Sequence, residues 1–388
     1  MKPFVIFLLL FNFSWNCSAQ DFKLQLIGSS ISETKIIDSL QYNPLHKNTK
    51  SINEEISQFS ERASKIGYIE NKLLENTKTS DSTYTAKLDL GKKTKFIRIY
   101  IGKDNALEDL VLTEKKNDTI ILPYKDTEAF LKSTLQKLEQ KGFALASLRL
   151  TNIRNKNQTL FADLVFDSKK QRKLNSIVLK HPDDKKTNFP KGHLTQLNRK
   201  YKNKIFNQNI IQQIHDDFEQ FGFVSQIKFP EILFTKDTTK AYVYLEKRKS
   251  NTFDGFVGFS NNDNKKIVFN GYLDFTLENT LGAGEQFSLY WKSDGNKQKT
   301  FNTSLELPYI FKSPFGLKAQ IHIFKQDSTY QNTKTAIDLG YFINYNSRIY
   351  LGYQATESSD IQNTNSAQLN DFKNSFFTSN FEYSKNDI

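Results

Sequence analysis

A junction of glycine and an aromatic residue occurs three times in the first 250 residues, and it constrains the fold more than any other feature. The three junctions are Gly67–Tyr68, Gly142–Phe143 and Gly222–Phe223, about 75 and 80 residues apart. A stretch of helical hydrophobic period precedes each glycine, and strand-forming residues follow it. Glycine at a helix end tolerates left-handed dihedrals that other residues avoid. Such spaced self-similarity indicates an array of small modules.

Each copy is predicted to hold a small sheet covered by helices. In the first copy a strand at 22–28 precedes helices at 32–40 and 51–65, and strands follow at 69–75, 82–90 and 95–102. The first five of these elements give the order β-α-α-β-β. We therefore expect three α+β modules, over residues 21–102, 103–181 and 182–250, with strands at 95–102 and 173–181 closing the first and second.

The first residues indicate export. Lys2 is followed by the apolar run FVIFLLLFNF and by Cys17 and Ala19, small residues placed as in a cleavage site, which predicts a signal peptide over residues 1–19. A lipid-attached Cys17 is the competing interpretation, but Trp15 and Asn16 are poor neighbours for lipoprotein processing. Because the chain has only this cysteine, neither a disulfide nor a cysteine metal site is expected in the mature protein.

The charge of the chain favours a solvated surface over a nucleic-acid site. The net charge is +12, from 54 Lys and Arg against 42 Asp and Glu, and the lysines are scattered among acidic residues. After the signal, no apolar stretch is long enough for a transmembrane helix, which needs about 18 residues or more.

From about residue 251 the hydrophobic period changes from helical to two. In 266–278 one predicted face carries Ile267, Phe269, Leu273 and Phe275, whereas the other is largely polar, and the split recurs in the later strands. A soluble sandwich would also alternate. The links after the second, fourth and sixth strands look tighter than the polar links after the first, third, fifth and seventh, which favours a membrane barrel. Aromatic residues near strand ends fit an interfacial girdle: Trp291, Tyr309, Phe311 and Tyr330.

The array followed by a barrel resembles the outer-membrane assembly factor superfamily, which joins periplasmic polypeptide-transport-associated (POTRA) modules to a surface-antigen β-barrel, as in BamA-like and TamA-like proteins and two-partner secretion transporters. The resemblance rests on the three junctions, on LDLGKKTKFIRIYIG ending at Gly102, and on LENTLGAGEQFSLYW with LELPYIFKSPFGL. It implies an antiparallel transmembrane barrel over residues 251–388 in the outer membrane of a Gram-negative bacterium, with the modules in the periplasm. Only about eight strands can be counted where the family has sixteen, so we expect the front part of a longer barrel; a small eight-stranded barrel is the alternative.

The resemblance implies binding and guiding of other chains, without cofactor, rather than enzymatic chemistry. The implied partners are unfolded outer-membrane or secreted polypeptides, the lipid bilayer and possible accessory lipoproteins. Assembly or translocation is the leading hypothesis, with a two-partner secretion transporter for one dedicated partner and a passive porin-like barrel as alternatives. We predict no catalytic or metal-binding residue, because the five histidines show no ligand spacing and no nucleophile elbow occurs.

Two sets of residues are candidates for polypeptide binding. The strand after each junction is the expected sheet edge, where a client could add a strand; it could equally complete its own sheet or pack on the next module. The edge candidates are Ile69, Leu73, Ala144, Leu148, Val224 and Ile227. The first barrel strand is the expected seam, with glycines that weaken pairing or relieve crowding; its candidates are Phe253, Gly255, Val257, Gly258 and Phe259. The module-defining residues are Gly67, Gly142 and Gly222.

Overall fold

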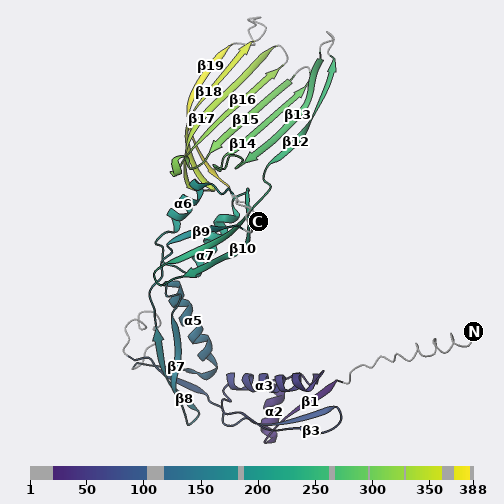
Figure 1. Ribbon diagram of the computed structural model, residues 1–388, viewed down its shortest axis with the longest axis vertical. Coiled ribbons are helices and arrows are strands. Elements are labelled where there is room, and N and C mark those ends of the chain that lie inside the picture. The colour runs from purple at the N-terminus through teal and green to yellow at the C-terminus, as the bar shows by residue number, and fades with distance from the viewer. Residues whose placement is uncertain are drawn as a thin grey trace, which may run out of the picture. The chain divides into compact units, whose positions relative to one another are not determined.

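The computed structural model describes residues 21–102, 118–181, 188–261, 267–295, 298–326, 329–360 and 371–384 (Figure 1). The chain divides into two compact units. One comprises residues up to 138 with 145–169, and the other comprises 139–144 with 170–388. The predicted signal peptide, residues 1–19, lies outside the described residues.

The first module is a four-stranded sheet with two helices. Its elements are β1 (Phe22–Gly28), α2 (Ile31–Ser39), β2 (Leu45–His46), α3 (Thr49–Lys65), β3 (Lys72–Lys78) and β4 (Thr83–Asp89), with the sheet order β2-β1-β4-β3. Helix α3 buries Ile52, Ile56, Phe59 and Ala63, which share one face because they are three or four residues apart. The Asn48 side chain caps this helix by accepting a hydrogen bond from the Ser51 amide at 2.8 Å.

The second module repeats this sheet. Its elements are β5 (Phe96–Tyr100), β6 (Thr119–Pro123), α5 (Thr127–Gln140), β7 (Ser147–Lys156) and β8 (Thr159–Asp167), with a short 3₁₀ turn at Tyr124–Asp126 and the order β6-β5-β8-β7. The buried side chains of Ile97, Ile99 and Leu160 form the centre of its core.

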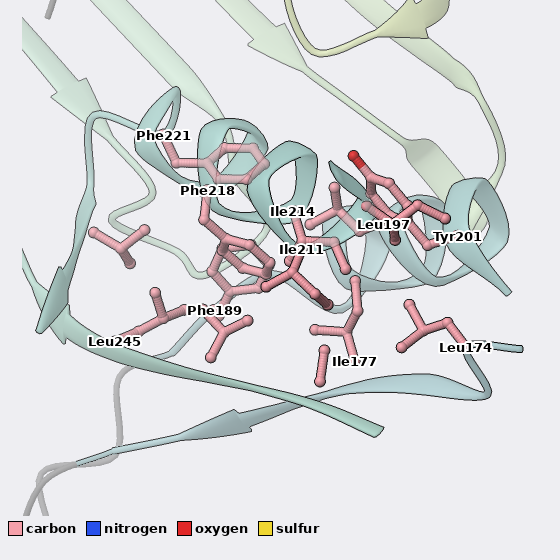
Figure 2. Packing of buried hydrophobic residues seen from close by; sticks show 14 of the residues in the cluster. Leu174, Ile177, Phe189, Leu197, Tyr201, Ile211, Ile214, Phe218, Phe221 and Leu245 are labelled. Carbon is pink, nitrogen blue, oxygen red and sulfur yellow. The ribbon is translucent and has the colours of Figure 1, made fainter. Parts of the chain in front are cut away.

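The third module has a three-stranded sheet and two helices. Its elements are β9 (Ser176–Lys180), α6 (Lys191–Tyr201), α7 (Gln208–Glu219), β10 (Val224–Phe234) and β11 (Thr239–Lys247), with the order β10-β11-β9. Ile211, Ile214 and Phe218 of α7 point toward Ile177 and Leu245 of the sheet in Figure 2. Burial of each such side chain stabilises the fold by roughly 1.5–3 kcal/mol.

The predicted β-α-α-β-β order is present in the third module and, with the two-residue strand β2 added between the helices, in the first, but two strands were assigned to the wrong module. The segment predicted at 95–102 forms β5 of the second sheet, and that at 173–181 forms β9 of the third. Strand β4 pairs with β1 on one side and β3 on the other, and β8 pairs with β5 and β7, so neither has a free side for the strand that follows. Each strand therefore begins a new sheet, and the predicted boundaries at 102/103 and 181/182 are one strand too late.

The remaining strands form one antiparallel sheet in chain order. They are β12 (Thr252–Asn261), β13 (Ile267–Glu278), β14 (Gln286–Asp294), β15 (Gln298–Leu307), β16 (Phe315–Gln326), β17 (Tyr330–Asn344), β18 (Ser347–Asp360) and β19 (Phe372–Tyr383). Within the described residues β12 and β19 do not pair with each other, so the sheet is not closed. Among the same residues, no helix is long and apolar enough to cross a membrane.

The predicted contrast between tight and loose links is wrong. Strand β14 ends at Asp294 and β15 begins at Gln298, whereas the supposedly tight link between β13 and β14 spans residues 279–285 and that between β15 and β16 spans 308–314. Polar residues expected in loops extend the hairpins instead, because a strand can continue with polar side chains on one face.

Candidate functional site

The strand that follows each junction lies at a sheet edge. Strands β3, β7 and β10 are terminal in their sheets, so each leaves one row of backbone N–H and C=O groups without a partner strand among the described residues. Every residue of β3 is exposed. An edge of this kind is a template onto which another extended chain can pair.

The edge candidates have different environments. Leu73 on β3 and Ile227 on β10 are exposed, by 48% and 46%. Leu148 on β7 packs against the core of the second module, and Val224 on β10 is buried in that of the third. The exposed apolar residue of β7 is instead Ile153, which alternation within the strand could have indicated.

Ile69 and Ala144 do not lie on the edge strands. Both are in turns, before β3 and β7 respectively. Ile69 packs against the core of the second module, and Ala144 against that of the third. At these two positions the alternative of packing on the next module is therefore the observed one, because the turn directs the side chain away from the sheet it precedes.

The junction glycines tie a module to the linker that follows it. Gly67 has φ +115° and Gly142 has φ +92°. The Gly67 carbonyl accepts a hydrogen bond from the Thr94 amide and the Gly142 carbonyl accepts one from the Arg172 amide, both at 2.8 Å. A Cβ atom on Gly67 would lie 2.4 Å from the Thr94 carbonyl oxygen. The repeated junction is therefore a backbone connection between successive modules.

The third junction differs from the other two. Gly222 is not among the residues of positive φ, and a Cβ atom there would lie 2.7 Å from Oε2 of Glu278 on β13. The expected left-handed glycine is therefore absent at this copy. Its small size instead allows close approach to the eight-stranded sheet.

Gly67→Ala is expected to lower the free energy of unfolding by about 2–3 kcal/mol, because alanine is strained at this φ and its Cβ would displace the Thr94 carbonyl. Gly91 provides the matched control. It has φ +68°, and a Cβ atom there makes only ordinary contacts, so Gly91→Ala should cost about 1 kcal/mol. Urea unfolding of both variants measures the difference, and equal losses would contradict the role of Gly67 in the linker.

One face of the eight-stranded sheet is apolar across all eight strands. Cross-strand partners place Phe259 beside Phe269, Leu317 beside Leu339, and Tyr353 beside Phe377 on this face. Many of these side chains are exposed, including Phe259 at 77%, Ile337 at 61% and Phe377 at 93%. A contiguous exposed apolar surface of this kind marks a site of contact with a membrane or with another protein. The predicted alternation is confirmed, and Tyr309, expected near a strand end, lies in the turn after β15.

The opposite face is polar and carries two ion pairs between strands. Arg348 forms an ion pair with Glu306, which also accepts a hydrogen bond from the Tyr350 hydroxyl at 3.0 Å. Lys318 pairs with Glu382 at 2.6 Å. The two ion pairs join strands that are three apart in the sheet, β15 with β18 and β16 with β19.

The first strand of the sheet, β12, lies at its edge. Phe253, Val257 and Phe259 project from the apolar face, each exposed by more than half. Gly255 and Gly258 approach β13 closely: added Cβ atoms would lie 2.4 Å from the Tyr272 carbonyl oxygen and 2.6 Å from Oδ1 of Asn270. Close packing therefore accounts for the glycines, and the unpaired edge is the feature that suits a seam.

The third module packs on the turns of the sheet through a histidine that sequence reasoning missed. His193 of α6 is 1% exposed, and neither ring nitrogen has a hydrogen-bond partner. Its ring contacts Tyr309 at 4.8 Å, Phe221 at 5.4 Å and Tyr345 at 5.7 Å between centroids. A Cβ atom on Gly284, in the turn after β13, would lie 2.0 Å from the His193 Cε1.

Burial lowers the pKa of His193 to about 3, with a smaller contribution from Arg348. Burial also raises the pKa of Tyr345 to about 12. The ring of His193 is therefore neutral at ordinary pH. The burial of His193 could have been predicted from its spacing, because His193, Leu197 and Tyr201 recur every four residues on the buried face of α6.

Small α/β modules with free edge strands, followed by an antiparallel sheet with one exposed apolar face, define a chain of POTRA-like modules joined to a barrel-type sheet. No family model matches the chain, and no curated protein matches it. Solved structures with a similar fold include BamA of Haemophilus ducreyi lacking POTRA domains 1–3, at 16% identity and TM-score 0.46, over 74% of this chain and 59% of that one.

Two further structures of similar fold are BamA POTRA3–5 of Haemophilus influenzae, at 14% identity and TM-score 0.37, and CdiB of Acinetobacter baumannii, at 13% and 0.36. The match to the H. influenzae structure covers 61% of this chain and 100% of that one. The match to CdiB covers 68% of this chain and 54% of that one. The chain thus spans less than two thirds of the H. ducreyi BamA structure.

Proposed function

We propose that this chain is part of an outer-membrane factor that receives unfolded exported polypeptides in the periplasm and promotes their insertion into, or passage across, the outer membrane. The observation that carries the proposal is the combination of free edge strands on the small modules with an exposed apolar face on the eight-stranded sheet. Within the part of the chain that the structure describes, no strand pairs with these edges and many side chains of the apolar face are exposed.

The module edges suit clients of many sequences. Pairing along β3, β7 or β10 would use backbone hydrogen bonds, which depend little on the client's side chains. The exposed Leu73, Ile153 and Ile227 would add apolar contacts at alternate positions. An unfolded outer-membrane strand, with alternating apolar residues and free backbone groups, has the matching chemistry.

The large sheet suits a lipid environment. Its apolar face would contact acyl chains, and its polar face, with the two ion pairs, would line a hydrated interior. Because backbone groups are costly to leave unpaired in lipid, the edges β12 and β19 need partner strands there. The edge residues Phe253, Val257 and Phe259 of β12 are our candidates for pairing with a client strand.

Site-specific photo-crosslinking tests the proposal. A benzoylphenylalanine at Leu73 or Ile227 should cross-link to newly exported polypeptides, whereas one at Tyr100 should not. Tyr100 is the matched control because it is 50% exposed but lies on β5, which is paired on both sides. Many cross-linked species would support a general assembly role, and one species a dedicated transporter. Equal cross-linking at all three positions would contradict strand addition.

A further inference from the structure

A cavity of about 460 Å³ lies between helices α6 and α7 of the third module and the turns of the eight-stranded sheet. Pro314, Tyr341 and Ile343 make its wall on the side of the sheet mainly apolar. On the side of the helices, Leu197 and Phe221 line it together with polar and charged residues, among them Arg199 and Gln220. A cavity with one apolar and one cationic side is suited to an amphipathic anion.

Arg199 is the cationic group that remains available in this cavity. Lys200 is paired with Asp217 at 2.7 Å, and Asp217 also accepts a hydrogen bond from the Tyr201 hydroxyl at 2.7 Å. The Gln196 side chain donates to the Lys312 carbonyl at 2.5 Å. Arg199 is exposed and forms no ion pair with any residue that the structure describes. Its planar guanidinium can bind a phosphate with two parallel hydrogen bonds.

The apolar wall continues the lipid-facing side of the sheet. Tyr341 and Ile343 are the last members of the exposed row on β17 that begins with Ile337 and Leu339. Tyr341 stacks edge-on with Phe315 at 5.5 Å, and Phe311 in the nearby turn is 98% exposed. Aromatic side chains at strand ends are typical of the level of lipid headgroups. The cavity therefore opens where a headgroup would meet the helices.

We propose that this cavity binds the headgroup of an anionic glycerophospholipid. The phosphate would lie on Arg199, and the acyl chains would lie along the exposed row of β17, from Ile343 and Tyr341 to Leu339 and Ile337. This proposal rests on the assignment of the apolar face to lipid. Binding would hold the third module against the membrane surface at the turns of β15, β16 and β17. A free phosphate would use Arg199 but not the apolar wall, which is why the lipid is the occupant.

Native mass spectrometry of the detergent-solubilised full chain, titrated with phosphatidylglycerol or phosphatidylethanolamine, tests the site. Phosphatidylglycerol should bind more tightly, and Arg199→Gln should reduce its binding about fivefold, the effect of one basic residue at an anionic surface. Arg154→Gln is the control, because Arg154 is an exposed arginine on β7, far along the chain from the cavity, and should leave binding unchanged. Circular dichroism confirms that both variants remain folded.

Three outcomes would overturn the proposal: equal binding of both lipids, unchanged binding by Arg199→Gln, or equally tight binding of inorganic phosphate or glycerol 3-phosphate. Partition into vesicles separates this proposal from the proposed function. A chain that enters vesicles but shows no preference for phosphatidylglycerol contradicts only the lipid site, whereas a chain that enters them with position 337 accessible to a water-soluble quencher contradicts the assignment of the apolar face.

Discussion

Stability of the protein is expected to fall as the pH drops below about 6.5, and His193→Phe should remove most of that fall. The folded pKa of His193 is about 3, below the ordinary value of 6.5, because the ring is desolvated. The unfolded chain therefore binds the proton more readily, so the stabilisation is complete above about pH 6.5 and is lost progressively toward pH 3. At about 1.4 kcal/mol per pH unit, the full loss is about 5 kcal/mol, of which about 2 kcal/mol should be present at pH 5.

Urea unfolding in detergent at pH 8 and pH 5 measures this effect as the difference between the native protein and the variant. At pH 8 His193→Phe should be nearly neutral, because both ring nitrogens lack partners and the surrounding side chains are aromatic. His215→Phe serves as the control for the number of histidines, since its ring contacts Phe229 outside this cluster. An identical pH dependence in native protein and His193→Phe would show that His193 is not buried at the turns.

Ile337→Arg is expected to destabilise the membrane-inserted chain by about 2–4 kcal/mol, the cost of a cation on the lipid side of a barrel near the middle of the bilayer. Ile337 is 61% exposed and lies midway along β17, where it is paired with Ala319 and Tyr353 on the apolar face. In water the same substitution would remove an exposed apolar side chain at little cost.

Gln320→Arg is the matched control, because Gln320 neighbours Ala319 on β16 and points to the polar face. Its effect should be within about 1 kcal/mol. Unfolding of both variants from phospholipid vesicles measures the contrast. Equal destabilisation, or no destabilisation by Ile337→Arg, would mean that the exposed apolar face does not contact lipid.

Element types were predictable where a single period dominated. The helical spacing of Ile52, Ile56 and Phe59 predicts α3, and strict alternation in β13 predicts which side chains share a face. Partnership between strands was less predictable, because nothing local in 95–102 or 173–181 shows that β4 and β8 already have both sides occupied. The predicted lengths of the links between strands were wrong for a related reason, because polar residues are compatible with both a loop and the hydrated face of a strand.

The candidate site was predictable only in outline. The edge position of β3, β7 and β10 was implied by the family resemblance, but Ile69 and Ala144 proved to be turn residues, and Val224 is a core residue. His193 was passed over because a histidine among polar neighbours looks like a surface residue. Its burial arises from Tyr309 and Tyr345, which lie more than a hundred residues further along the chain.

The sequence by itself determined the repeat, the change of hydrophobic period near residue 251 and the apolar face of the final strands, because these depend on spacing between neighbours along the chain. Only the tertiary structure decided which strand belongs to which sheet, why Gly67 and Gly255 must be glycine, and how His193 and the Arg199 cavity form. These features depend on contacts between segments distant in sequence, for which local patterns carry no information.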